Sequence, residues 1–364
     1  MAKRPRRVGV MANNVGGYSR AVMRGVAAFG VSRGWNTSIL GFYGERGQIL
    51  HDFDGLIVQL SLDEPRAVAE RTRVPVVNVS SAIDRYPMPS VVSDDRAVGR
   101  LGAEHLLALG HRHLAFYRPD RRQFADLRQE GFIQRCGDGV RASVITEQRE
   151  LAKLLRRGQM PVAIMGANDR MALAALEAAR AHERDCPGEV AVLGVDNDDL
   201  IAALADPPLS TVNTARERIG YEAAALLDRL MDGERVPSDF VSRVPPRGVI
   251  VRRSTDRLAV ADEAVAEAAR FIAANAARPI GTDDVAARVA VGRRQLERRF
   301  RAALGRGVHE ELQRCRIDRA KQLLHDTDLT LAQVADASGF GSASYFATAF
   351  RRAVGSTPGD YRQS

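Results

Sequence analysis

Short apolar runs alternate with longer amphipathic segments through residues 7–250. Runs with the length and boundaries of buried parallel strands occur at 7–11, 37–41, 55–59, 74–78, 91–92, 113–117, 162–165 and 190–194. The segments between them place apolar residues at helical spacing, as at 97–109, where the pattern stops at Gly110. Strands that alternate with helices predict a doubly wound α/β architecture built from parallel sheets.

A different pattern occupies residues 282–361 and occurs twice. Ala286 corresponds to Ala335 at an offset of 49, whereas an offset of 50 relates Leu296, Phe300 and Gly305 to Phe346, Phe350 and Gly355. Each copy predicts a short helix, a tight turn and a second helix. The change of offset places one extra residue in the turn of the second copy.

The second helix of the first copy is apolar on one side and basic on the other. Its apolar residues recur at a spacing of four: Leu296, Phe300 and Leu304. Its other face carries Arg293, Arg294, Arg298 and Arg301. A charged face is often merely solvated. The internal repeat and ten Arg or Lys against four Asp or Glu in 293–321 instead favour a recognition helix for double-stranded DNA.

The repeat resembles the C-terminal module of AraC/XylS-type transcription regulators. The second copy carries the likeness in the order Val334-Ala335, Ser338-Gly339-Phe340, Tyr345-Phe346, Phe350-Arg351, Gly355, Thr357-Pro358 and Tyr361-Arg362. Residues 312–324 resemble the long helix that joins the two units in that family. The first copy departs from the pattern at Gly292, where a serine N-cap is usual, and at 306–308, which lacks a proline.

Position on the two recognition helices suggests which side chains reach DNA. In the first unit these are Arg293, Arg294, Glu297 and Arg298. In the second unit they are Ser342, Ala343, Ser344 and Thr348. The small residues of the second unit predict weaker base readout and more reliance on phosphate contacts.

Composition agrees with a DNA-binding protein of more than one domain. A chain of 364 residues suggests two or three domains, and its net charge of +8 favours a polyanionic partner. The cysteines Cys136, Cys186 and Cys315 stand apart, without the spacing of a disulfide frame or zinc site. No apolar run has the length of a signal peptide core or membrane span, so a cytoplasmic protein is expected. No cofactor or metal is expected either.

Polar residues follow the ends of several predicted strands. They include Asn13, Asp94, Asn168, Asp169 and the run 196–198. Open α/β sheets bind ligands at the carboxyl ends of their strands, and clustered carboxylates and amides suit the hydroxyls of a sugar. Each residue alone could instead cap the helix that follows it.

The same region resembles the effector-binding core of LacI/GalR-type repressors, a two-lobed fold similar to periplasmic sugar-binding proteins. The likeness lies in segments 106–111, 166–172, 188–196 and 209–212. It implies sugar contacts by Arg128, which precedes Gly131-Phe132, and by Asn168 and Asp196. The positions of Asn13, Tyr18, Arg20 and Asp94 in the topology add further candidates.

The predicted organisation is a sensor domain at 1–250, a linker at 251–262 and an all-α domain with two helix-turn-helix units at 263–364. This combination resembles bacterial xylose-operon activators, which implies a pentose effector, a homodimer and contact with RNA polymerase. Whether the protein activates or represses its target genes stays open.

An enzyme has little support in the sequence. No phosphate-binding loop, nucleophile elbow or dinucleotide fingerprint is present. His111 and His113 fit structural roles better than metal binding, and no partner cluster supports a metal at Asp94-Asp95. The alternative is a cytosolic sugar-binding protein or sugar-acting enzyme whose C-terminal domain is only an interaction module.

Overall fold

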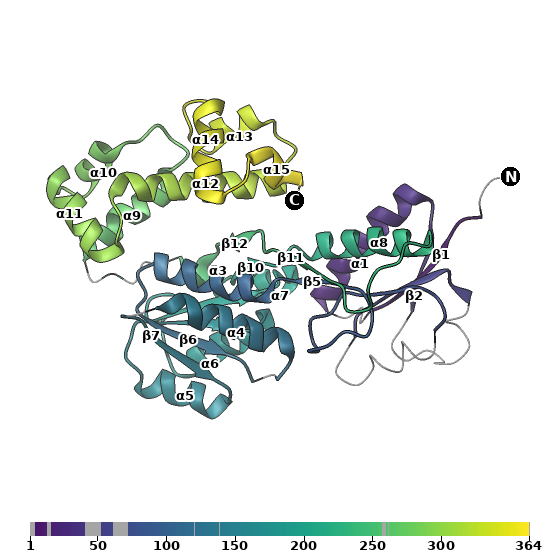
Figure 1. The fold of residues 1–364 in the computed structure, drawn as a ribbon. Helices are drawn as coiled ribbons and strands as arrows, with labels where there is room; N and C mark the ends of the chain where they lie inside the picture. Colours follow the sequence, from purple (N-terminus) through teal and green to yellow (C-terminus); the bar gives the residue numbers. More distant parts are fainter. Residues whose placement is uncertain are drawn as a thin grey trace. The chain divides into compact units, whose positions relative to one another are not determined.

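The computed structural model describes residues 4–12, 16–40, 52–60, 72–119, 121–137, 139–256, 260 and 262–363. The chain divides into two units: Met1–His105 with Arg112–Thr255, and Leu106–His111 with Asp256–Ser364. Both β-sheets belong to the first unit, and the helices from α9 onward belong to the second (Figure 1).

The first sheet has the strand order β11-β5-β4-β3-β1-β2, and its neighbouring strands run parallel. Its strands are β1 (Arg7–Met11), β2 (Asn36–Leu40), β3 (Gly55–Val58), β4 (Val76–Asn78), β5 (Ser90–Ser93) and β11 (Val241–Val244). Strands β3, β4 and β5 are buried along their whole length, as expected for the centre of a parallel sheet.

The second sheet has the order β12-β10-β9-β8-β6-β7 and is parallel except for β12, which pairs antiparallel with β10. Its strands are β6 (His113–Tyr117), β7 (Arg141–Ile145), β8 (Val162–Gly166), β9 (Val190–Val195), β10 (Ser210–Asn213) and β12 (Gly248–Ile250). Each sheet with its helices forms one lobe of the unit.

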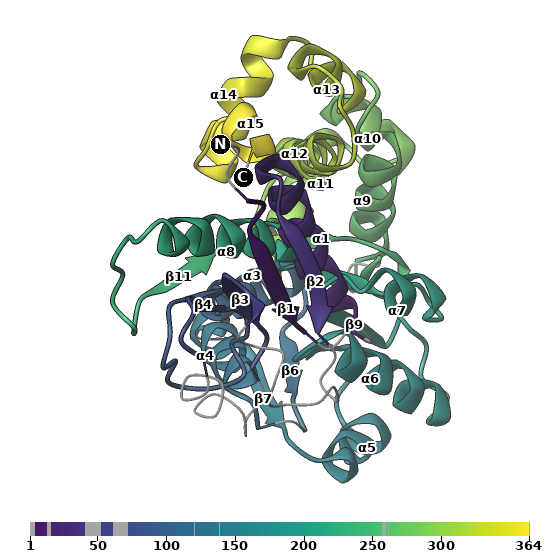
Figure 2. The same ribbon diagram turned by 90° about the vertical axis from the view of Figure 1, so that its right-hand side faces the viewer.

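Helices cover the two sheets. They are α1 (Gly17–Arg33), α3 (Asp95–Ala108), α4 (Gln123–Cys136), α5 (Gln148–Arg157), α6 (Asp169–Ala181), α7 (Asp199–Leu204) and α8 (Arg216–Met231). Helix α4 lies on one side of β6 and α6 on the other (Figure 2). Helices α1 and α8 approach closely, since a Cβ on Gly25 would lie 1.9 Å from the Glu217 oxygen.

The chain crosses between the lobes at three places among the described residues: from β5 to β6, from β10 to β11 and from β11 to β12. The crossing segments lie against one another. Asp94 N donates to Val244 O at 2.8 Å, and Arg247 N donates to Asn213 O at 2.9 Å. Adjacent connecting segments of this kind can act as a hinge, about which two lobes open and close.

The second unit is helical. Its helices are α9 (Glu263–Asn275), α10 (Thr282–Arg288), α11 (Arg293–Leu304), α12 (Val308–Asp326), α13 (Leu331–Ala337), α14 (Ala343–Val354) and α15 (Pro358–Gln363). One core gathers around Leu296 and Phe300, and a second gathers around Phe346 and Phe350. Helix α12 contributes to both cores and so joins the two helix-turn-helix units.

The turns of the two units differ by one residue, as predicted. Residues 289–292 join α10 to α11, and residues 338–342 join α13 to α14. The longer turn needs a glycine at 339, where φ is +86° and a Cβ would lie 2.2 Å from Ala276 O.

The predicted fold class is confirmed: two lobes with parallel sheets, followed by an all-α domain with two helix-turn-helix units. Strands β7, β10, β11 and β12 were not predicted: β7, β11 and β12 are edge strands with half-exposed residues, and β10 is a four-residue strand between β9 and β12. The two units separate after Thr255, inside the predicted linker, and Ser254 and Thr255 are buried in a short 3₁₀ helix (Arg253–Thr255).

Candidate functional site

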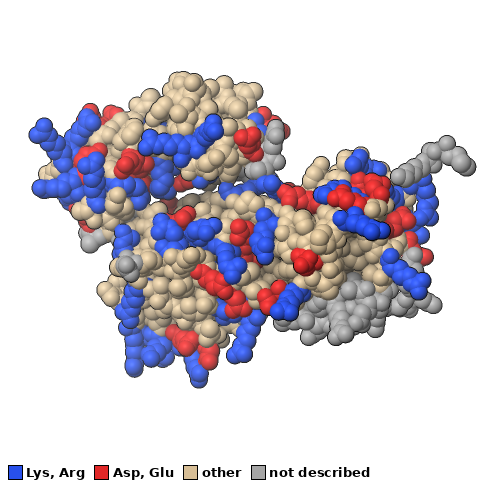
Figure 3. All heavy atoms as spheres, viewed as in Figure 1, with Lys and Arg blue, Asp and Glu red and all other residues tan. Residues whose placement is uncertain are grey.

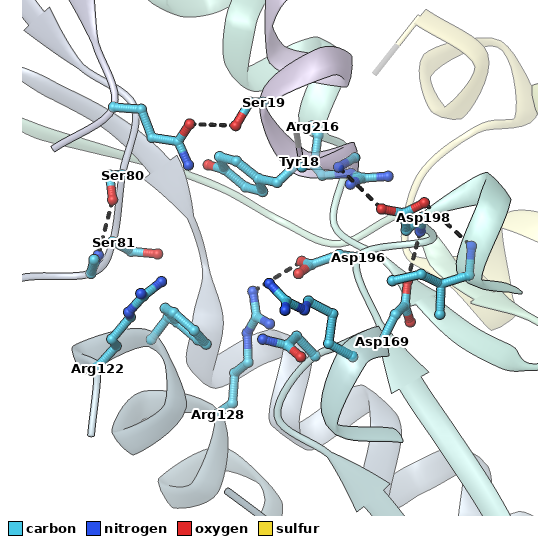
Figure 4. A pocket seen from close by; sticks show the side chains of 18 residues that line it. Tyr18, Ser19, Ser80, Ser81, Arg122, Arg128, Asp169, Asp196, Asp198 and Arg216 are labelled. Carbon is cyan, nitrogen blue, oxygen red and sulfur yellow. Dashed lines mark hydrogen bonds and ion pairs between the residues drawn. The ribbon is translucent and has the colours of Figure 1, made fainter. Parts of the chain in front are cut away.

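A pocket of about 230 Å³ lies between the two lobes of the first unit, at the carboxyl ends of their strands (Figure 4). The first lobe lines it with Gly16, Gly17, Tyr18, Ser19, Gln59, Ser80, Ser81 and Ala82. The second lobe and the segment entering α8 add Arg122, Phe124, Arg128, Asn168, Asp169, Arg170, Asp196, Asp198, Ile201 and Arg216. Its volume lies below the roughly 300–1,000 Å³ of sites for drug-sized ligands, so the pocket suits a smaller molecule.

Arg128 stands at the centre of the pocket wall and is 3% exposed. Its Nε donates to Asp95 Oδ1 at 2.8 Å, and its Nη2 donates to Asp196 Oδ1 at 3.3 Å. Its Nη1 donates to Ala167 O at 2.6 Å, and the guanidinium lies 4.9 Å from the centre of the Phe124 ring. Burial alone would lower the pKa of Arg128, but Asp196 and Asp95 outweigh burial and raise it.

Asp169 begins α6 and is 2% exposed. It accepts a hydrogen bond from Thr211 Oγ1 at 2.6 Å and another from Asp198 N at 2.6 Å. Burial and the nearby charge of Asp196 outweigh these bonds and raise the pKa of Asp169 to about 7. The carboxyl group therefore titrates near neutral pH.

Two further polar residues serve the backbone as well as the pocket. Asn168 accepts a hydrogen bond from Met171 N at 3.0 Å and thus caps α6. Asp198 caps α7 and also accepts from Gly17 N at 3.1 Å, which links the second lobe to the start of α1 in the first. Asn168 and Asp198 therefore each line the pocket and cap a helix at the same time.

The turn after β9 places Asp196 in an unusual backbone conformation. The φ angles are +101° at Asp196 and +50° at Asn197, both uncommon for residues with side chains. Thr214 Oγ1 donates to Asp196 Oδ1 at 3.3 Å. Such local strain is typical of binding and catalytic sites, where the surrounding structure holds it in place.

The structure brings together five of the eight residues suggested for the effector site. Tyr18, Arg128, Asn168, Asp169 and Asp196 line the pocket. Arg20 and Asp94 do not line it: Arg20 lies 3.8 Å from Asp198, and Asp94 accepts from Ala97 N at 3.0 Å as the cap of α3. Asn13 lies outside the described residues.

Several pocket residues were missed by sequence reasoning. Asp198 belongs to the polar run after β9 and so had a signal. So did Asp95, which directly follows Asp94 and accepts from the pocket residue Arg128 without lining the pocket itself. Gln59, Ser80, Ser81 and Arg216 had none, because they come from loops and a helix start far apart in the sequence. Only the fold brings them together.

Helix α11 presents a basic face opposite its buried face. Leu296 and Phe300 are fully buried, whereas Arg294 and Arg298 are exposed. The residues Arg293, Arg294, Glu297, Arg298 and Arg301 line one shallow surface hollow. Figure 3 shows basic side chains gathered over the part of the chain that holds α10 and α11.

Two residues predicted to contact DNA also have partners within the protein. Arg293 Nη1 lies 3.2 Å from Asp283 in α10. Glu297 Oε2 accepts from Val308 N at 3.4 Å, at the start of α12. Arg294 and Arg298 are both exposed on this face.

Helix α14 also has one exposed face and one buried face, and the residues on its exposed face are smaller than those of α11. Ser342 caps it by accepting from Tyr345 N at 3.2 Å. The next residues, Ala343 and Ser344, are exposed together with Thr348, whose Oγ1 donates to Ser344 O at 3.1 Å. Phe346 and Phe350 anchor the opposite face in the core.

Within the described part of the chain, no helix is both long and apolar enough to cross a bilayer. The same residues contain no group of three or more His, Cys, Asp or Glu side chains placed to bind a metal ion. His113 instead lies with its Nδ1 2.8 Å from Gln159 O, in a structural role.

Known proteins share both units and their order. Residues 103–255 match the periplasmic binding protein-like domain, and residues 285–364 match the helix-turn-helix domain. The xylose operon regulatory protein of Escherichia coli (strain K12) is 27% identical over 379 aligned positions, covering 98% of this chain and 96% of the relative.

Solved structures agree with this order. A xylose-binding transcription activator superposes with a TM-score of 0.64 at 27% identity, covering 100% of this chain and 99% of its own. A dimeric Lac repressor shares the fold of the first unit, with a TM-score of 0.56 at 22% identity over 68% of this chain. The chain is therefore a DNA-binding transcription regulator, with a periplasmic-binding-protein-like sensor domain followed by an AraC-type helix-turn-helix domain.

Proposed function

We propose that this regulator responds to a pentose-type sugar held in the pocket between the lobes and activates a catabolic operon for that sugar. The main support is the pocket itself, in a chain whose relatives over nearly full length regulate a xylose operon. Because those relatives match both domains, a sugar-binding protein or enzyme with an idle C-terminal module is not favoured.

The chemistry of the pocket suits a polyhydroxylated ligand. Each sugar hydroxyl both donates and accepts, and Asp196, Asn168 and Gln59 offer acceptors and donors from both lobes. Tyr18 closes one side, with its hydroxyl donating to Val79 O at 2.6 Å. A ligand that touches both lobes binds the closed form more tightly than the open form, and this difference shifts the equilibrium toward closure.

Closure is then communicated to the DNA-binding domain of a cytoplasmic homodimer, which contacts RNA polymerase at the promoter. In each domain, α11 and α14 enter successive major grooves about 34 Å apart. Arg294 and Arg298 read bases from α11. Ser342, Ala343, Ser344 and Thr348 contribute from α14, with less base readout.

The test couples two measurements on the full-length protein. Calorimetric titration with pentoses, hexoses and their acidic derivatives identifies the best ligand, and operator binding is then measured with and without it. Asp196→Asn is expected to weaken the ligand at least tenfold, because hydrogen bonds to a charged acceptor are about twice as strong as neutral ones. Asp239→Asn, an exposed carboxylate outside the pocket, serves as the control. Operator binding that no sugar changes would refute the proposed response.

A further inference from the structure

Several arginines line the pocket. They are Arg122, Arg128, Arg170 and Arg216. Arg128 is already matched, because Asp95 and Asp196 both accept hydrogen bonds from it. Arg122, Arg170 and Arg216 add three further guanidinium groups to the pocket lining.

Arg216 is the most informative of these side chains. It is the first residue of α8 and only 7% exposed. Its Nη2 donates to Asn197 O at 2.7 Å, but its Nη1 is buried and has no hydrogen-bond partner among the described residues. A buried guanidinium nitrogen without an acceptor is costly, so an acceptor on the ligand would remove that cost.

The remaining carboxylates near Arg216 are already engaged. Asp198 accepts from three backbone N–H groups, those of Gly17, Leu200 and Ile201. Asp169 accepts from Thr211 and from Asp198 N, and it is partly protonated at neutral pH. Neither carboxylate accepts a hydrogen bond from Arg216 Nη1.

Arg122 and Arg170 add exposed positive charge at the same pocket. Arg122 immediately precedes α4, and Arg170 lies in the first turn of α6. The N-termini of both helices add partial positive charge there. Figure 4 shows Arg122 and Arg216 on different sides of the pocket, with Arg128 between them.

We propose that the effector is an anionic pentose derivative, with a carboxylate or phosphate held by Arg216 and attracted by Arg122 and Arg170. This inference rests on the proposed function, because it assigns the chemical class of the ligand in the same pocket. The sugar hydroxyls bind Asp196, Asn168 and Gln59, and the acidic group lies toward Arg216. Guanidinium groups bind carboxylates and phosphates alike through paired hydrogen bonds. The proposal therefore specifies a negatively charged group, and experiment decides between carboxylate and phosphate.

Calorimetric titration of the full-length protein with D-xylose, D-xylonate and D-xylose 5-phosphate tests the proposal. At least one anion is expected to bind tenfold or more tightly than D-xylose, and the comparison of the two anions identifies carboxylate or phosphate. Arg216→Gln is expected to weaken the anion about tenfold or more while changing D-xylose binding much less. Arg216→Lys retains part of the affinity, because it keeps the charge but loses the paired geometry.

Two further variants protect the test against misfolding. Arg170→Gln changes an exposed side chain of the pocket and is expected to weaken the anion by a smaller factor. Arg157→Gln changes an exposed arginine of α5 outside the pocket and should leave binding unchanged. If D-xylose binds at least as tightly as both anions, or if Arg216→Gln and Arg170→Gln weaken all three ligands equally, the anionic assignment is overturned and the sugar response is left standing. If none of the three ligands or other sugars binds, the proposed function fails as well.

Discussion

Arg128 joins two carboxylates in a buried network, and its removal should destabilise the sensor domain. Arg128→Met leaves Asp95, whose side chain is fully buried, without its charge partner. Breaking a buried ion pair from one side costs roughly 3–5 kcal/mol. Urea unfolding followed by circular dichroism is expected to show this loss in the transition of the sensor domain.

The double variant Arg128→Met/Asp95→Asn is the matched control. It removes both charges of the pair, so no uncompensated charge stays buried, and part of the lost free energy of unfolding should return. A single variant as stable as the wild type would show that Asp95 finds another partner, and would contradict the role given to Arg128.

Asp169 should make stability depend on pH in the direction opposite to most carboxylates. Its pKa is raised to about 7 in the folded state, mainly by burial, against an ordinary value of about 3.9 in the unfolded chain. Between these values the folded state keeps a proton that the unfolded state has lost. The contribution of Asp169 to the free energy of unfolding is therefore fully present below about pH 4 and is lost as pH rises toward about 7.

Asp169→Asn imitates the protonated form and should remove this dependence. The amide can accept from Asp198 N and donate to Thr211 Oγ1, in place of the two bonds that the carboxylate accepts. The stability of the variant relative to the wild type should increase from pH 5 to pH 8 in urea unfolding. Asp239→Asn, at an exposed position, should show no such trend. A constant difference across this range would contradict the raised pKa.

Residue-level prediction from sequence identified pocket-lining residues where a motif fixed the position and missed the lining where a turn decided it, while contact of these residues with a sugar stays a prediction. Arg128, Asn168 and Asp196 were each found through a local motif, and all three line the pocket. Asp94 and Asp95 are adjacent carboxylates at a strand end, and only the start of α3 decides which one caps the helix and which one meets Arg128. Successive residues at a helix start point in directions that differ by about 100°, and sequence alone does not give the first residue.

At the level of elements, α11 is the helix whose role can be tested most directly. Arg298→Ala is expected to reduce the preference for operator over unrelated DNA by about 1–3 kcal/mol, the range for an arginine paired with guanine. Binding to unrelated DNA should change much less. Fluorescence anisotropy with operator and scrambled duplexes at one salt concentration measures both affinities.

Arg270→Ala provides the comparison, because Arg270 is an exposed arginine of α9 in the same unit, paired with Glu263 at 2.8 Å. Its loss should not alter the preference for operator. Equal losses on both duplexes in Arg298→Ala would mean that Arg298 contacts phosphate only, and base readout would have to come from other residues.

The helical elements were easier to predict than the sheet edges for a physical reason. The spacing of Leu296, Phe300 and Leu304 is local, and all three are buried in one core as that spacing requires. The edge strands β11 and β12 pair with strands that are distant in the sequence, and their burial is partial. Neither their length nor their hydrophobic pattern separates them from loops, so their pairing partners were needed to identify them.

At the level of the whole molecule, sensing requires that effector and DNA affect one another. If the effector changes operator affinity by some factor, thermodynamic linkage requires operator DNA to change effector affinity by the same factor. The relation holds whatever the structural route between the two units. It therefore tests coupling without any assumption about how the units are arranged.

The last prediction applies this relation to the regulator. The Kd of the effector is measured by calorimetry on the free protein and on the protein saturated with operator, and the Kd of the operator is measured with and without saturating effector. The two ratios should agree and lie within about 5–150-fold, the usual range of coupling between sites. Asp196→Asn should need more effector to reach the same change in operator affinity, because it weakens binding in the pocket, whereas Arg298→Ala should keep the effector Kd of the free protein. Ratios that disagree would mean that effector and DNA act on different populations of the protein, and a single closing equilibrium would then be rejected.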